Sequence, residues 1–147
     1  MRRIGTIDDF AERYALAVVG AGPAGLAAAS TASALGVETV LLDENPSPGG
    51  QIYRAVTTAP VKRRERLGEE DRRGAELARE LGVSASAYAP AATVWNVAPP
   101  LGEEGPGRGF EIGVSLGGRA RLIGASEVIL ATGAQERPFP IPGWTLP

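Results

Sequence analysis

Short apolar runs separated by a glycine-rich turn mark the first part of the chain. Residues 15–19 are continuously apolar, as in a strand that is buried on both faces of a parallel sheet. The alanine-rich stretch that follows predicts a helix from about Pro23 to Leu35, with Gly36 as its C-terminal stop. A second run over residues 38–42 predicts a parallel strand beside the first. Together these elements predict a βαβ unit.

The pattern beyond residue 44 predicts one more helix and several short strands. Residues 69–81 carry Leu77 and Leu81 at the i, i+4 spacing of one helix face. In residues 110–116 apolar and polar side chains alternate, which predicts a half-buried antiparallel strand. The remaining predictions are a lead-in over residues 1–14 with a short helix from about Asp8 to Tyr14, a turn-rich loop over 45–54, one or two short strands within 83–97, a surface loop over 99–109, a hairpin turn at Gly117-Gly118, a partner strand over 121–123 and a buried strand over 127–131.

Three glycines join the first predicted strand to the first predicted helix in G-x-G-x-x-G spacing. Gly20 permits a tight turn out of the strand, Gly22 lets the backbone approach a pyrophosphate, and Gly25 lets the helix pack closely on the strand. Pro23 falls in the first helical turn, where a missing N–H group costs little. Because the N–H groups and the dipole at a helix N-terminus attract phosphate, this turn is the candidate site for the phosphates of a nucleotide.

Two acidic residues follow the second predicted strand. Asp43 has the better spacing from the glycine motif for binding a ribose hydroxyl, and Glu44 is a close second. An acid at this position disfavours a 2′-phosphate, which would pair with arginine. The alternative interpretation is a βαβ unit whose glycines serve packing alone. Strand, helix, second strand and terminal acid in one register favour dinucleotide binding instead.

The composition is that of an ordinary globular domain. With 147 residues, the chain is long enough for one domain with a hydrophobic core. The net charge of −2 provides no excess of basic residues for binding nucleic acid, and residues 62–80 mix both signs as on a solvated helix face. No apolar run approaches the ~20 residues of a membrane span, and the first residues lack the apolar core of a signal peptide. The sequence therefore predicts a cytoplasmic protein without a membrane span or a nucleic-acid partner.

Cysteine and histidine are both absent from the sequence. Without cysteine there is no disulfide, thiolate metal site or redox dithiol. Without histidine there is no imidazole base and no histidine ligand for a metal. The sequence therefore identifies no catalytic residue and no metal site, and any chemistry must come from a bound cofactor, a carboxylate or another chain.

Three separated motifs resemble a known superfamily. Residues 20–25, 49–51 and 128–134 stand in the order and rough spacing found in two-dinucleotide-domain flavoproteins of the pyridine nucleotide-disulfide oxidoreductase superfamily. Residues 42–54 and 131–147 are similar to one branch, which includes the flavoprotein subunits of opine oxidase, hydroxyproline dehydrogenase and hydrogen cyanide synthase. The resemblance implies an FAD-binding domain.

The resemblance covers residues 15–147 and implies a set of cofactor-binding residues that follow the FAD molecule. They are Gly20, Gly22, Pro23, Ala24 and Gly25 at the pyrophosphate, Asp43 or Glu44 at the adenosine ribose, Thr93 or Val94 at the adenine edge, Gly50 and Gln51 at the flavin side, and Ala131, Thr132 and Gly133 over the cofactor.

The sequence departs from the disulfide reductases of that superfamily in two respects. Their paired redox cysteines are absent, so a disulfide reductase mechanism is unsupported. The sequence stops at Pro147, where such flavoproteins begin a second, NAD(P)-type domain. We therefore expect an incomplete FAD domain over residues 15–133, between the lead-in over residues 1–14 and an exit segment over residues 134–147. Any NAD(P) would bind in the missing portion.

The expected fold is α/β, with a Rossmann-like FAD/NAD(P)-binding parallel sheet and a small antiparallel β insertion. The resemblance implies a flavin-dependent oxidoreductase, or its N-terminal part, that transfers hydride from a small amine or amino-acid-like substrate to FAD. Electrons would then pass to a partner subunit of a heteromeric dehydrogenase or to another acceptor. Three alternatives remain: an NAD-binding module without flavin, a non-catalytic nucleotide-binding subunit, and an inactive remnant of a longer gene product.

Overall fold

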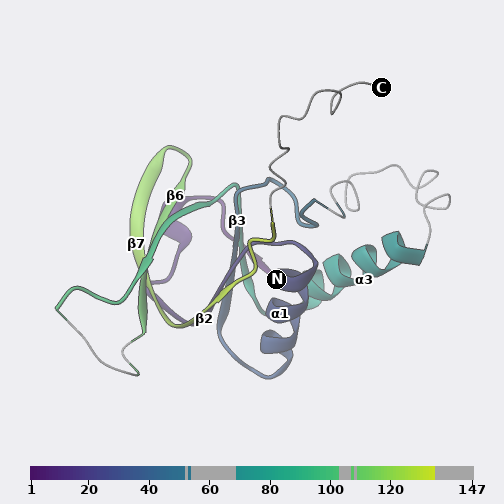
Figure 1. Cartoon of the computed structure of the whole chain (residues 1–147), viewed down its shortest axis with the longest axis horizontal. Coiled ribbons are helices and arrows are strands. Elements are labelled where there is room, and N and C mark those ends of the chain that lie inside the picture. The colour runs from purple at the N-terminus through teal and green to yellow at the C-terminus, as the bar shows by residue number, and fades with distance from the viewer. Residues whose placement is uncertain (52, 54–68, 103–106, 108, 135–147) are drawn as a thin grey trace, which may run out of the picture.

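A seven-stranded mixed sheet runs through the computed structural model (Figure 1). The structure describes residues 1–51, 53, 69–102, 107 and 109–134, with residues 69–72 described in backbone only. The strands stand in the order β1-β4-β3-β2-β7-β6-β5. The elements are β1 (Arg2–Arg3), η1 (Ile7–Asp9, a 3-10 helix), β2 (Arg13–Val19), α1 (Pro23–Ala34), β3 (Thr39–Asp43), α3 (Glu69–Val83), β4 (Ala87–Pro90), β5 (Thr93–Ala98), β6 (Phe110–Leu116) and β7 (Arg119–Leu130).

The predicted βαβ unit is present as β2, α1 and β3, with boundaries one or two residues from those expected. β2 pairs in parallel with β3, which pairs in parallel with β4. The predicted helix over residues 69–81 is α3, and the strands expected within residues 83–97 are β4 and β5. The apolar runs of the sequence therefore predicted β2, α1 and β3 correctly, whereas β1, a short strand in the expected lead-in that pairs in parallel with β4, was not predicted.

Strand β7 belongs to both parts of the sheet. Its first half pairs antiparallel with β6, and its second half pairs in parallel with β2. The two separate strands predicted over residues 121–123 and 127–131 are therefore wrong, because the chain continues as one strand through Gly124. A Cβ at Gly124 would lie 3.2 Å from Cγ of Arg13. The glycine thus lets β2 approach closely where the sequence pattern suggested a break.

Helices α1 and α3 cover one face of the sheet (Figure 1). α1 and α3 pack against each other, and the cluster beneath them takes alternate residues of the central strands. Neighbouring residues of a strand point to opposite faces of the sheet. A strand that is covered on both faces is therefore apolar throughout, which explains the continuous apolar run in β2. The members of this helix-side cluster are Leu16, Val18, Ala21, Leu26, Ala29, Leu41, Leu81 and Tyr88.

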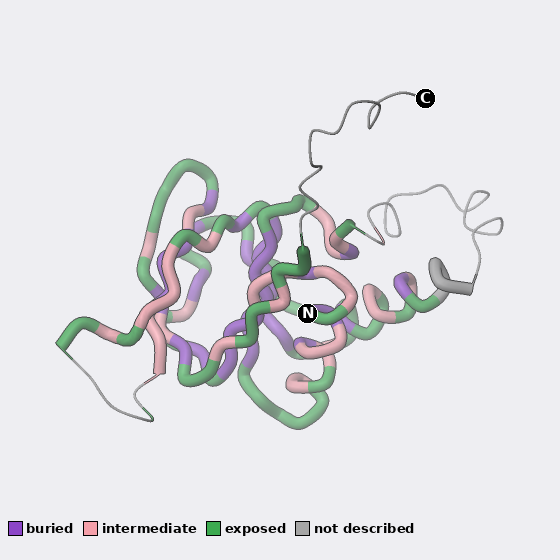
Figure 2. The backbone as a smooth tube through the Cα atoms, in the orientation of Figure 1, coloured by how far each residue is buried: buried purple, intermediate pink, exposed green. Residues whose placement is uncertain are grey.

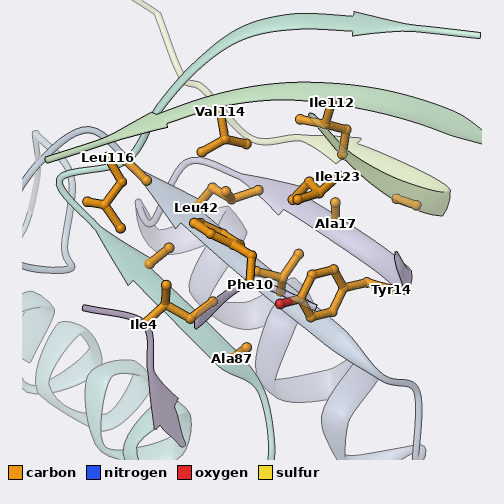
Figure 3. Close-up of a cluster of buried hydrophobic side chains, with 14 of the residues drawn as sticks. Ile4, Phe10, Tyr14, Ala17, Leu42, Ala87, Ile112, Val114, Leu116 and Ile123 are labelled. Atoms are coloured by element: carbon orange, nitrogen blue, oxygen red, sulfur yellow. The ribbon is translucent and has the colours of Figure 1, made fainter. Parts of the chain in front are cut away.

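The opposite face is covered by the strands of the antiparallel part and by the N-terminal residues. Figure 3 shows Ile112, Val114 and Ile123 above the parallel strands. Ile4 and Phe10 from the predicted lead-in are buried in the same cluster. In Figure 2 the buried residues accordingly concentrate along the central strands, while the hairpin between β6 and β7 is exposed.

The N-terminal residues form a different local structure from the one expected. The predicted helix from Asp8 to Tyr14 is wrong, because the 3-10 helix covers Ile7–Asp9 and β2 already begins at Arg13. The Tyr14 hydroxyl accepts a hydrogen bond of 2.9 Å from the N–H group of Ala11. This bond satisfies a backbone donor that a helix would have paired internally, so the chain can turn directly into the strand.

The predicted fold class is confirmed: a parallel α/β sheet carries a small antiparallel part. Within the described ranges, no helix is long and apolar enough to cross a membrane. The domain boundaries at residues 14 and 133 stay predictions. Beyond Ala134, the predicted exit segment lies outside the described residues, as do positions 52 and 54 of the predicted loop over residues 45–54.

Two buried tyrosines are expected to respond oppositely to removal of their hydroxyl groups. The Tyr88 hydroxyl is buried and has no hydrogen-bond partner among the described residues, and burial raises its pKa far above the ordinary value, so it stays neutral. Tyr88→Phe should therefore leave the free energy of unfolding unchanged or raise it by about 1 kcal/mol, whereas Tyr14→Phe should lower it by about 1 kcal/mol by orphaning the Ala11 N–H group. Urea denaturation measures both. Equal destabilisation by the two variants would contradict the different hydrogen bonding of the two hydroxyl groups.

Candidate dinucleotide-binding site

A cavity of 790 Å³ opens at the carboxyl ends of β2, β3 and β7. Its lining includes Val19, Leu42 and Leu130, which lie at or next to the last residues of these three parallel strands. Ligands of open α/β sheets bind outside the carboxyl ends of the strands, and the volume suits a small-molecule site. The cavity is therefore the candidate binding site.

The glycines of the G-x-G-x-x-G motif have two distinct structural roles. Gly20 has a φ of +103°, and a Cβ there would lie 2.8 Å from the carbonyl carbon of Ala131. A Cβ at Gly25 would overlap the carbonyl oxygen of Gly20 and lie 2.9 Å from its carbon. A Cβ at Gly22 would meet nothing within 4 Å, and Gly22 lines the cavity. Packing alone therefore accounts for Gly20 and Gly25 but leaves Gly22 free for a ligand.

The first turn of α1 lies at this cavity. Gly22 is the N-cap, and Pro23 and Ala24 also line the cavity. A helix N-terminus presents unpaired N–H groups and the positive end of the helix dipole. Among the described residues that line the cavity, none is lysine or arginine. Anionic ligand groups would therefore be bound by backbone N–H groups at this end.

The loop after β3 rests on the glycine turn. The N–H group of Gly49 donates a 2.8 Å hydrogen bond to the carbonyl oxygen of Ala21. A Cβ at Gly50, whose φ is +61°, would lie 2.9 Å from Cα of Gly22. Gly50 and Gln51 consequently line the cavity beside the first glycines, although they are far from them in the sequence.

The two acids at the end of β3 have different environments. Asp43 is only 6% exposed, and one carboxylate oxygen accepts a hydrogen bond from the N–H group of Ala21. Its other oxygen accepts from the backbone N–H and the side-chain amide of Asn45, at 2.7 and 2.9 Å. Glu44 is exposed, and no described residue forms a hydrogen bond or ion pair with its carboxylate. Both acids line the cavity.

The turn between β4 and β5 forms another part of the lining. The N–H group of Ala91 donates to the carbonyl oxygen of Asn45 at 3.0 Å, and that of Ala92 donates to the carbonyl oxygen of Asp43 at 2.9 Å. Ala91 has a φ of +57°, a conformation that L-residues rarely adopt. These bonds bring Thr93 and Val94 to the cavity.

The end of β7 completes the lining. The N–H group of Ala131 donates a 2.8 Å hydrogen bond to the carbonyl oxygen of Val19, which extends the parallel pairing with β2 by one residue. Thr132 and Gly133 follow and are exposed, and Gly133 has a φ of +71°. All three residues line the cavity.

The structure brings together every predicted cofactor-binding residue except Gly25, which lies beneath the glycine turn. The assignment of each residue to a part of FAD stays a prediction. Sequence reasoning missed several lining residues. Val19, Leu42 and Leu130 could have been found from their positions at or next to the ends of predicted parallel strands. Nothing in the sequence indicates Asn45 and Ala92, because turn contacts bring them to the cavity. The cavity also includes Ala134.

Comparison with known proteins shows which family the chain resembles. The model for "Pyridine nucleotide-disulphide oxidoreductase" matches residues 14–146. An opine oxidase subunit of Agrobacterium tumefaciens (strain Ach5) is 47% identical over 147 residues, which are 100% of this chain and 29% of that protein. Hydrogen cyanide synthase subunit HcnB of Pseudomonas aeruginosa is 33% identical over 132 residues, covering 88% and 26% of the two chains. The crystal structure of L-proline dehydrogenase from P. horikoshii has a TM-score of 0.63 and 20% identity, covering 94% and 24%.

The chain belongs to the pyridine nucleotide-disulphide oxidoreductase family. The predicted family, its opine oxidase branch and FAD as the cofactor are confirmed. The chain spans less than a third of the length of these curated relatives. The names of both relatives describe them as subunits.

Proposed function

We propose that this chain forms the FAD-binding part of a flavin-dependent oxidoreductase that acts on a small amine or amino-acid-like substrate in the cytoplasm. The observation that supports the cofactor site best is Gly22, whose missing side chain leaves open space at the N-terminus of α1. The substrate class is supported by the similarity to the opine oxidase protein of Agrobacterium tumefaciens. It is also consistent with the fold shared with an L-proline dehydrogenase.

The described residues fit FAD because the cavity offers hydrogen-bond donors for the phosphates of a dinucleotide and carboxylates for its ribose hydroxyl groups. Backbone N–H groups at the start of α1 would bind the pyrophosphate, and Glu44 or Asp43 would accept hydrogen bonds from the ribose. Val94 would lie at the adenine, and Gly50 and Gln51 at the flavin side. When bound, FAD supplies the hydride acceptor.

This chain would contribute binding and orientation rather than acid–base groups. Among the described residues, the titratable side chains that line the cavity are the carboxylates of Asp43 and Glu44, and neither is at the proposed flavin side. We propose that the groups touching substrate lie on another part of the protein or on a partner subunit of a heteromeric dehydrogenase. Both curated relatives are named as subunits, which supports the second arrangement. Any NAD(P) site stays outside this proposal.

A non-catalytic nucleotide-binding subunit is the second candidate function, and it is favoured by the fact that no described residue places an acid–base group at the proposed flavin side. A purified complex would distinguish the two. Bleaching of the flavin absorbance by an added amine or amino acid would show that FAD on this chain takes part in oxidation. Retention of oxidised flavin while the complex turns over that substrate would support the non-catalytic role.

The direct test is FAD binding by the purified chain, followed by flavin fluorescence quenching, with NAD and ATP as competitors. Selective quenching that NAD and ATP do not reverse supports the proposal. Displacement by NAD would favour an NAD-binding module. A folded chain that binds none of the three would contradict the proposal for these residues.

Gly22→Ser is expected to weaken FAD binding at least about tenfold, because the new side chain enters the space that the pyrophosphate would occupy. Serine is a good N-cap, so the free energy of unfolding should stay within about 0.5 kcal/mol of the original. Fluorescence titration and urea denaturation measure the two quantities. Gly82→Ser, which places the same side chain in open space on α3, is the matched control. Unchanged FAD affinity for Gly22→Ser would contradict the assigned pyrophosphate position.

A further inference from the structure

A glycine in the interior of α3 lies directly against the ring of Tyr53. A Cβ at Gly74 would lie 2.5 Å from Cγ and Cδ1 of Tyr53, and 2.8 Å from Cδ2. Glycine is less favourable than alanine inside a helix, so its presence here calls for a reason. The ring of Tyr53 explains the glycine, because the ring occupies the space that a side chain on this residue of α3 would need. Gly74 is buried and Tyr53 is half-buried.

The backbone of Tyr53 is connected to the proposed FAD site by two hydrogen bonds. Its N–H group donates to the carbonyl oxygen of Gly49 at 3.0 Å, and the N–H group of Gly49 donates to Ala21 at 2.8 Å. A Cβ at Gly49 would lie 2.8 Å from the carbonyl carbon of Tyr53, so the turn is tightly closed. Between these two ends lie Gly50 and Gln51, which line the cavity.

We propose that Tyr53 and Gly74 position the Gly50–Gln51 segment for the flavin side of FAD. The ring of Tyr53 fixes one end of the segment on α3, and the glycine turn after β2 fixes the other. α3 packs on α1, whose N-terminus borders the same cavity. Helix α3 therefore supports the proposed FAD site, although none of its described side chains lines the cavity. This inference rests on the proposed function, and Tyr53 and Gly74 are positioning residues.

The contact is tested first by thermal unfolding of a double-mutant cycle. Gly74→Ala alone should lower Tm by about 3 °C or more, because its methyl group overlaps the ring. In the Tyr53→Ala background the same change should raise Tm, because alanine is the better helix former. Gly82→Ala, with open space around its Cβ, should raise Tm in both backgrounds. The same sign for Gly74→Ala in both backgrounds would overturn the contact.

The positioning role is tested by comparing FAD with ADP, which carries only the adenosine and phosphate end. Gly74→Ala and Tyr53→Ala should weaken FAD binding about tenfold and leave ADP binding unchanged. Tyr53→Phe, which keeps the ring, should retain FAD affinity. Where Gly74→Ala does not fold, Tyr53→Ala gives the same measurement.

Two negative results would have different meanings. Equal loss of FAD and ADP binding, or unchanged FAD binding in the variants, would overturn the positioning role while leaving the proposed function intact. Failure of the unmodified, folded chain to bind FAD would contradict the proposed function itself and the positioning role with it.

Discussion

Gly25→Ala is expected to lower the free energy of unfolding by about 3 kcal/mol or more, the upper range for overpacking a closed interior. The added methyl group would overlap the carbonyl oxygen of Gly20 and lie 3.4 Å from Cβ of Ala131. Because the first obstacle is backbone, no side-chain rotation relieves it. Relief requires α1 to move away from β2, which would open the helix-side cluster around Leu26.

Urea denaturation of the purified variant measures this effect, and the m-value shows whether the native state has loosened. The matched comparison is Gly22→Ser, three residues earlier in the same motif, which we expect to affect FAD binding and not stability. Destabilisation of less than about 1 kcal/mol by Gly25→Ala would show that α1 can shift without loss of packing. Such a result would contradict the packing role assigned to this glycine.

Local patterns in the sequence were sufficient to predict the elements on which the site is built. The apolar run before Gly20 and the alanine-rich run after Pro23 specify a strand and a helix by their own periodicity. The two acids at the end of β3 were found by their spacing from the glycine motif. The glycine motif and the two acids were predicted from this local pattern, whereas Gly50, Gln51, Val94 and residues 131–133 were predicted only from the resemblance to the flavoprotein superfamily.

Features that depend on distant partners were not predictable. The sequence around Gly124 suggests a break, and only the position of Arg13 on β2 shows why the strand continues through this glycine. The sequence likewise shows Gly74 as a weak point in a helix, whereas the structure places Tyr53 against it. In both cases a glycine makes room for a side chain that is far away in the sequence. The local hydrophobic pattern does not depend on that side chain and therefore does not predict the contact.

The assignment of Asp43 shows a third limit. The spacing rule places an acid at the end of β3 and assigns it to a ribose. It does not reveal that both carboxylate oxygens already accept hydrogen bonds from Ala21 and Asn45. A rule based on spacing identifies the position of a functional group, whereas its hydrogen-bond partners decide what the group can still bind.

Asp43→Asn is therefore expected to lower the free energy of unfolding by about 3 kcal/mol and to weaken FAD binding at least about tenfold. A carboxylate accepts hydrogen bonds at both oxygens, but an amide accepts at one and donates at the other. In the variant, an NH₂ group would face either the N–H group of Ala21 or the donors of Asn45. In the first orientation the Ala21 N–H group loses its acceptor and the two bonds from Asn45 become weaker; in the second both donors of Asn45 lose their acceptor and the bond from Ala21 becomes weaker.

Glu44→Gln is the matched control, because Glu44 is exposed and adjacent in the sequence. It should change the free energy of unfolding by less than about 0.5 kcal/mol, and any loss of FAD affinity would then report contact with the ribose. The two effects of Asp43→Asn separate its possible roles. Loss of stability together with FAD affinity would identify Asp43 as the residue that holds the glycine turn and Asn45 in place. Loss of FAD affinity at unchanged stability would contradict that role and identify Asp43 as the ribose ligand, since the turn would then hold its shape without the carboxylate.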